Sequence, residues 1–74
     1  MSRLPTVTPR EMVAALKKAG FEEQNQTGSH LALHNPSTGR MTVVAIHTRD
    51  IKRGLMKKIL KQAGLSEDEF RELL

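Results

Sequence analysis

The feature that most constrains the fold is a helix-terminating pattern that occurs twice. Residues 16–21 read Leu-Lys-Lys-Ala-Gly-Phe and residues 60–65 read Leu-Lys-Gln-Ala-Gly-Leu, so both follow Leu-x-x-Ala-Gly-apolar. A glycine at this place ends a helix, because its left-handed backbone lets the next apolar residue fold back onto the last turn. The pattern predicts two helices that end before Gly20 and Gly64, with Phe21 folded back onto Leu16.

The starts of two helices are also marked. Thr8-Pro9-Arg10-Glu11 is typical of a capping box with proline at the first helical position, and it predicts a helix from about Pro9 to Ala19. Ser66-Glu67-Asp68-Glu69 is a second capping box, which predicts a short last helix. In the helix that ends before Gly64, six apolar residues at helical spacing are interpreted as its core-facing side: Ile51, Leu55, Met56, Ile59, Leu60 and Ala63.

The sequence between these helices favours strands. The three predicted strands are Phe21 to Gln26, Ser29 to His34 and Met41 to Ile46. A dense turn signal, Asn35-Pro36-Ser37-Thr38-Gly39, separates the last two. In the third strand the phase is ambiguous, because Val43 is as apolar as its neighbour Val44.

This order predicts one α+β domain over residues 1–74, with a helix, a three-stranded antiparallel sheet, a second helix and a short C-terminal helix. The short turns favour an antiparallel meander. The helices are expected on one face of the sheet, which leaves the other face open to solvent or a partner.

Charge points to a polyanionic partner. The chain has 12 basic and 8 acidic residues, a net charge of +4. The last ten residues carry four acidic residues and one basic residue, a local charge of −3, which leaves +7 on residues 1–64. Such an excess attracts nucleic acid, although it also serves solubility. With two Phe and no Tyr or Trp, aromatic base stacking is not expected as the main binding device.

Several classes of function are disfavoured. The chain has no cysteine, so disulfides and Cys-based metal sites are excluded and a reducing cytoplasm is the expected compartment. No apolar run approaches the roughly 20 residues of a membrane span, and Met1 to Pro9 lacks the apolar stretch of a signal peptide. No nucleotide-binding loop is present, so no small-molecule cofactor is expected.

His30 is the candidate catalytic residue. Leu31 and Leu33 are expected to face the core, and the alternation of a strand then turns His30 outward. An imidazole exchanges protons near neutral pH and can remove the proton of a ribose 2′-hydroxyl, a route to RNA cleavage that needs no metal. Gly28, two residues earlier, would let a phosphate approach closely. The same position also fits an ordinary surface histidine.

The two other histidines are weaker candidates. His34 is expected on the same strand face, but four residues span about 13 Å, too far for both rings to reach one phosphate. His47 would return toward His30 only if the third strand pairs with the second. No His-x-x-x-His helix accompanies the three histidines, so no metal site is expected.

Basic residues cluster around the second long helix. Arg53, Lys57 and Lys61 follow the spacing i, i+4, i+8 and form one row along the helix. Such a row suits a nucleic-acid backbone, although a solvated polar face has the same composition. The residues predicted to bind RNA are Gly28, Ser29, Arg49, Lys52, Arg53, Lys57, Lys58 and Lys61.

Two stretches together resemble the HicA family of mRNA interferase toxins of type II toxin–antitoxin systems. One is Gly28-Ser29-His30, which follows a helix ending in Ala19-Gly20-Phe21. The other is the long run from Gly54 to Leu65, followed by Ser66, Glu69, Phe70, Leu73 and Leu74. The resemblance covers nearly the whole chain, and the second stretch is the more specific.

The resemblance implies a fold like the double-stranded-RNA-binding domain and an endoribonuclease that cleaves mRNA and arrests growth. It implies that His30 is the catalytic residue and that a HicB-type antitoxin neutralises the toxin. Two departures concern RNA contacts. Ala45 stands where the family usually has Pro, and Gly54-Leu55-Met56-Lys57 replaces Gly-Thr-Leu-Arg, which loses a hydroxyl and a bidentate guanidinium.

Two alternatives remain beside the endoribonuclease. A non-catalytic RNA-binding module would use the same basic helix, and a protein-interaction domain would carry incidental charge. Substitution of His30 distinguishes the endoribonuclease from the RNA-binding module, because in the endoribonuclease it should abolish cleavage and spare RNA affinity. Salt-dependent RNA binding distinguishes both from the protein-interaction domain, which should bind no RNA.

Overall fold

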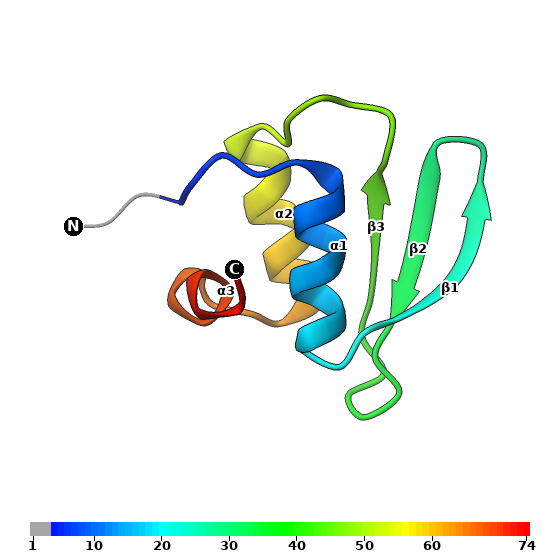
Figure 1. The fold of residues 1–74 in the computed structure, drawn as a ribbon. Coiled ribbons are helices and arrows are strands. Elements are labelled where there is room, and N and C mark those ends of the chain that lie inside the picture. The colour runs from blue at the N-terminus through cyan, green and yellow to red at the C-terminus, as the bar shows by residue number, and fades with distance from the viewer. Residues whose placement is uncertain (1–3) are drawn as a thin grey trace.

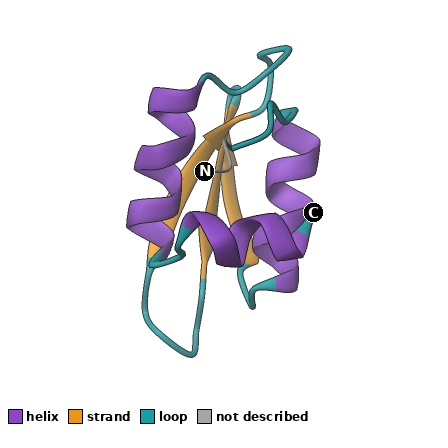
Figure 2. Cartoon of the chain, turned by 90° about the vertical axis from the view of Figure 1, so that its left-hand side faces the viewer, coloured by secondary structure: helices purple, strands orange, loops and turns teal. Residues whose placement is uncertain are grey.

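A computed structural model describes residues 4–74 and confirms the predicted α+β order (Figure 1). The elements are α1 (Pro9–Lys18), β1 (Glu22–Thr27), β2 (His30–His34), β3 (Met41–Ala45), α2 (Arg53–Ala63) and α3 (Glu67–Leu73). Helices α1 and α2 lie on one side of the sheet, and α3 crosses them on the side away from it (Figures 1 and 2). The molecule therefore has three layers, and one face of the sheet stays uncovered.

The predicted helix ends are present. Gly20 and Phe21 donate backbone hydrogen bonds to the carbonyls of Lys17 and Leu16, at 3.1 and 3.0 Å. Gly64 and Leu65 repeat this pair with Lys61 and Leu60, at 3.2 and 3.0 Å. Both capping boxes are formed, by the side chains of Thr8 and Glu11 before α1 and of Ser66 and Glu69 before α3. The shared pattern is thus the same C-terminal helix cap used twice.

The sheet has the strand order β1-β2-β3, and both pairs are antiparallel. Thr27 pairs with His30, so Gly28 and Ser29 form a two-residue turn between β1 and β2. The β2–β3 turn is ordered by Asn35, a buried residue whose side chain accepts a hydrogen bond from the Ser37 backbone at 2.9 Å. The same side chain donates to the carbonyl of Ala19, which ties the turn to the end of α1.

The core lies between the sheet and the helices. Leu31 and Leu33 point inward as predicted, and β3 contributes Thr42 and Val44 to the same face. The pairing of β3 with β2 therefore resolves its ambiguous phase, with Val43 on the outer face at 46% exposure. Phe70 of α3 is fully buried and closes the core from the opposite side.

Two expectations about the second long helix are wrong. Leu55 was predicted in the core but is 39% exposed. At about 100° per residue, it lies roughly 90° from the middle of the stripe formed by Met56, Ile59, Leu60 and Ala63. Ile51 is buried but precedes the helix, and it is held by a bridge to Val7.

Candidate active site

His30 lies at the start of the central strand. It pairs with Thr27 of β1 on one side and with Ala45 of β3 on the other. Its side chain is exposed, whereas Leu31 next to it is buried. The strand alternation thus turns His30 onto the uncovered face of the sheet, as the sequence predicted.

The turn before His30 is fixed from both sides. Ile46 donates a backbone hydrogen bond to the Ser29 carbonyl at 2.7 Å, and the Gln26 side chain donates to the Gly28 carbonyl at 3.2 Å. Gly28 has a φ of +59°, the conformation that a type II′ hairpin turn needs at its first central residue. The turn itself therefore explains the glycine. A carbon added there would meet no atom within 4 Å, so the surface in front of the turn is open.

A pocket of about 390 Å³ opens beside His30, between the outer face of β3 and one side of α2. Lys58 is the basic residue among those that line it. The pocket thus brings together an imidazole, an ammonium group and several apolar side chains. Its lining consists of His30, Val43, Ala45, Leu55, Lys58, Ile59 and Gln62.

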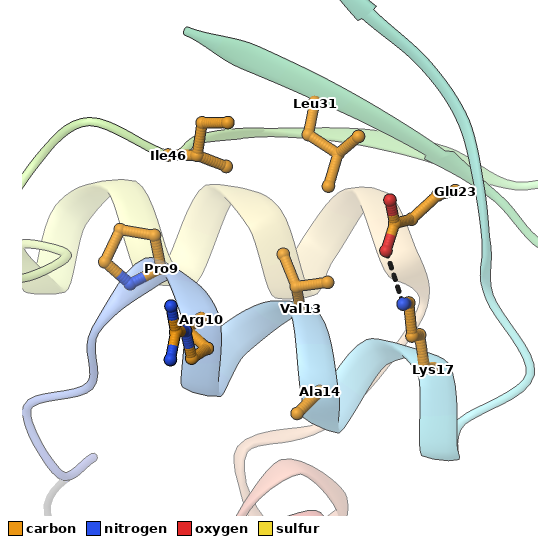
Figure 3. Close-up of a pocket in the computed structure, with 8 residues that line it drawn as sticks. All are labelled: Pro9, Arg10, Val13, Ala14, Lys17, Glu23, Leu31 and Ile46. Atoms are coloured by element: carbon orange, nitrogen blue, oxygen red, sulfur yellow. Dashed lines mark ion pairs between the residues drawn. The ribbon is translucent and has the colours of Figure 1, made fainter.

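Volume alone does not single out this pocket. A groove of about 410 Å³ lies between α1 and the sheet, where Leu31 and Ile46 face Val13 and the Lys17–Glu23 ion pair spans one end (Figure 3). None of the residues predicted for the site lines that groove. The His30 pocket is favoured because it contains an imidazole, a side chain that can act as a general acid or base.

The structure separates the predicted basic residues. Lys58 shares the His30 pocket with Leu55 and Gln62, at the spacing i, i+3, i+7. The row of Arg53, Lys57 and Lys61 is exposed but lies roughly 130° around the axis of α2 from that stripe, at about 100° per residue. The RNA-binding role of this row stays a prediction, and it would engage a different part of the RNA from the part next to His30.

Arg49 and Lys52 flank the start of α2. Arg49 is exposed in the bend after β3. Lys52 is the N-cap of α2, and its side chain makes no capping hydrogen bond. Lys52 and Arg53 line a third hollow of about 400 Å³, beside Leu4 and Met56. Asp50 lines the same hollow, and we refer to Arg49, Lys52 and Arg53, which flank the start of α2, as the basic corner.

The remaining histidines do not line the His30 pocket. His34 is partly exposed at the far end of β2 and pairs with Met41. His47 was expected to return toward His30 only if the third strand pairs with the second. Strand β3 does pair with β2, and His47 is exposed in the bend that follows β3. Within residues 4–74, no group of three or more His, Asp or Glu side chains is arranged so that it could hold a metal ion.

Of the seven residues that line the pocket, sequence reasoning predicted His30 and Lys58 as site residues. Leu55 was assigned to the core, Val43 had an ambiguous phase, and Gln62 was not singled out. The helical spacing contained a signal for the exposure of Leu55, because this residue lies at the border of the apolar stripe. Nothing in the sequence indicated Gln62, whose hydrogen-bond partner is Thr42, 20 residues away.

The fold and the His30 turn together agree with a match to a known family. The sequence model described as "HicA toxin of bacterial toxin-antitoxin" matches residues 9–65, which is most of the 74-residue chain. The chain belongs to the HicA toxin family. It is therefore a toxin of a toxin–antitoxin pair, as the resemblance of the two stretches implied.

The HicA match runs from the first residue of α1 to the residue after Gly64, so it includes the His30 turn and all of α2. Helix α3 follows it, and the buried Phe70 joins this helix to the core. No curated protein matched the chain in a sequence search. In the described part of the chain, residues 4–74, no helix has both the length and the apolar character needed to cross a membrane.

Proposed function

We propose that this HicA toxin is an endoribonuclease that cleaves mRNA in the cytoplasm, with His30 as its catalytic residue. The observation that carries the proposal is the position of His30, exposed at the rim of a pocket that also contains Lys58. A proton-transfer group and a cation at one place are what cleavage of a phosphodiester requires.

The chemistry uses the RNA's own nucleophile. Neutral His30 removes the proton of a ribose 2′-hydroxyl, and the 2′ oxygen attacks the adjacent phosphorus. The bond from phosphorus to the 5′ oxygen then breaks, and that oxygen takes a proton from solvent. The products are a 2′,3′-cyclic phosphate and a 5′-hydroxyl end, so no metal-bound water is needed.

The remaining predicted residues hold the RNA. The turn residues Gly28 and Ser29 leave an open surface for the backbone, and Lys58 lies next to the reacting phosphate. Arg49, Lys52, Arg53, Lys57 and Lys61 contact more distant phosphates. Replacement of Arg53, Lys57 and Lys61 by Gln should flatten the salt dependence of binding by about one unit per lost contact.

The partner of the toxin is a HicB-type antitoxin. An unchecked ribonuclease damages its host, and the simplest inhibitor covers His30 and the basic corner together. Such an inhibitor presents acidic groups to Arg49, Lys52, Arg53 and Lys57, because complementary charge speeds capture. Helix α3 is acidic in its first turn and closes the core through Phe70, so we place it outside this interface.

The decisive experiment induces the protein in a bacterial host, with and without His30→Ala, and follows growth and mRNA integrity. The wild type should arrest growth and fragment mRNA, whereas the variant should do neither while it still binds RNA. Growth arrest by both proteins without mRNA fragments would instead identify a non-catalytic RNA-binding module.

A further inference from the structure

One hydrogen bond orients a polar side chain in the His30 pocket. The hydroxyl of Thr42, a residue that is 2% exposed on the inner face of β3, donates to the Oε1 atom of Gln62 at 2.9 Å. Among residues 4–74, Gln62 Nε2 has no protein acceptor. Because this bond directs the oxygen of the Gln62 amide at Thr42, the amide presents its two N–H donors to the pocket.

The pocket around Gln62 suits a flat, partly apolar group. Val43 and Leu55 line it and are 46% and 39% exposed, so the pocket has accessible apolar surface on both a strand and a helix. Lys58 is in the same lining, and none of the seven lining residues is acidic. An apolar wall, a donor and a cation without a nearby carboxylate together match one nucleotide, with its base on Val43 and Leu55 and its phosphate at Lys58.

We propose that Gln62 is a specificity-determining residue, which donates to the base of the nucleotide next to the cleaved phosphate, and that Thr42 is its positioning residue. This inference rests on the proposed ribonuclease function. An amide that pairs bidentately with adenine turns both its oxygen and its N–H group to the base, but the Gln62 oxygen is directed at the Thr42 hydroxyl. The pocket should therefore prefer a keto oxygen, as in guanine or uracil, over the amino group that adenine and cytosine present at the same place.

The test is to cleave an RNA of randomised sequence with the purified toxin and to sequence the fragment ends. The wild type should favour guanine or uracil over adenine or cytosine at one position beside the cut. Gln62→Leu should still cleave far faster than His30→Ala, but its preference should fall by roughly 3- to 10-fold, the weight of one hydrogen bond. Gln62→Glu, which offers acceptors only, should shift the preference toward adenine and cytosine.

Thr42 is tested by its effect on the same preference. Thr42→Val removes the hydroxyl and should weaken the preference, whereas Thr42→Ser keeps the hydroxyl and should restore it. Gln24→Leu is the matched control, because Gln24 is an exposed glutamine of β1 outside the pocket lining. Circular dichroism confirms that each variant is folded, and Gln62→Leu serves alone if Thr42→Val does not fold.

Three outcomes overturn the proposal in different ways. If the wild type cleaves no RNA, the ribonuclease function fails and the base subsite fails with it. If the wild type cleaves but Gln62→Leu keeps an unchanged preference, only the role of Gln62 is wrong. If Gln62→Leu keeps the preference and loses binding of the purified antitoxin, the pocket serves the protein partner instead of RNA.

Discussion

The two faces of the sheet differ in how deeply their side chains are buried. On the packed face, Leu33 and Val44 are completely buried against the helices. On the open face, Met41 and Val43 remain 50% and 46% exposed. Val43 and Val44 are therefore the same residue type, side by side in β3, in opposite environments. Burial on the packed face contributes to stability, whereas the half-exposed Met41 and Val43 contribute much less to it.

This difference suggests that stability and function can be changed independently in this protein. The packed side also includes α1 and α3, each started by a complete capping box. The His30 pocket joins outward-facing side chains of β2 and β3 to one flank of α2, the helix that lacks a side-chain cap. Substitutions of apolar core residues on the packed side should lower stability, and substitutions in the lining of the His30 pocket should lower cleavage.

The largest expected effect is on the open side, at His30. His30→Ala should slow cleavage of a defined RNA by about 10²- to 10⁴-fold, the usual contribution of a general base. The free energy of unfolding should change by less than about 0.5 kcal/mol, because the side chain is exposed. Single-turnover kinetics and urea denaturation measure the two quantities.

His34→Ala is the matched control for His30. Both residues are on the open face of β2, but four residues separate them, about 13 Å. The control should cleave at close to the wild-type rate. Equal losses in both variants would mean that the open face as a whole matters and that His30 has no special role.

The second prediction uses the valine pair. Val44→Ala removes two buried methyl groups and should lower the free energy of unfolding by about 2 kcal/mol. Val43→Ala should change it by less than about 0.5 kcal/mol but should weaken cleavage, because Val43 lines the pocket. Similar destabilisation by both would show that the open face is covered in solution, for example by a second copy of the chain.

The division into two faces was only partly predictable from the sequence. Helix ends and the inward direction of Leu31 and Leu33 follow from local patterns, and the structure bears them out. Val43 and Leu55 could not be assigned in this way, because their exposure depends on strand pairing and on how α2 packs against β3. The pairing of Thr42 with Gln62 joins two elements and has no local signal at all.

The third prediction compares two adjacent lysines of α2. Lys58 lines the His30 pocket, whereas Lys57 belongs to the row on another side of the helix. Lys58→Gln should lower kcat/KM by about tenfold, less than the 10²- to 10³-fold effect of an enclosed donor in an oxyanion hole. Lys57→Gln should mainly weaken RNA affinity and reduce the salt slope by about one unit.

The two lysine variants are compared in cleavage assays over a range of salt concentrations. A salt-independent difference between them would locate Lys58 at the reacting phosphate. If the two variants lose the same amount of activity at every salt concentration, Lys58 is one more distant phosphate contact, and the pocket contains no catalytic cation.

The smallest expected effect is on the packed side, in the capping box of α3. Hydrogen bonds from the backbone and then the side chain of Ser66 hold the pKa of Glu69 below its usual value of 4.5. Because the folded pKa is the lower one, ionised Glu69 stabilises the fold above pH 4.5, and this contribution is lost as the pH falls through the folded pKa.

Glutamine can also complete a capping box, so Glu69→Gln keeps the hydrogen bond and removes only the charge. Urea denaturation between pH 3 and 7 should show the wild type as slightly more stable at neutral pH, with the difference vanishing in acid. Cleavage at neutral pH should be equal, since Glu69 does not line the His30 pocket. A pH-independent difference would assign the effect to packing of α3, and a change in cleavage would show that the two sides of the molecule are coupled.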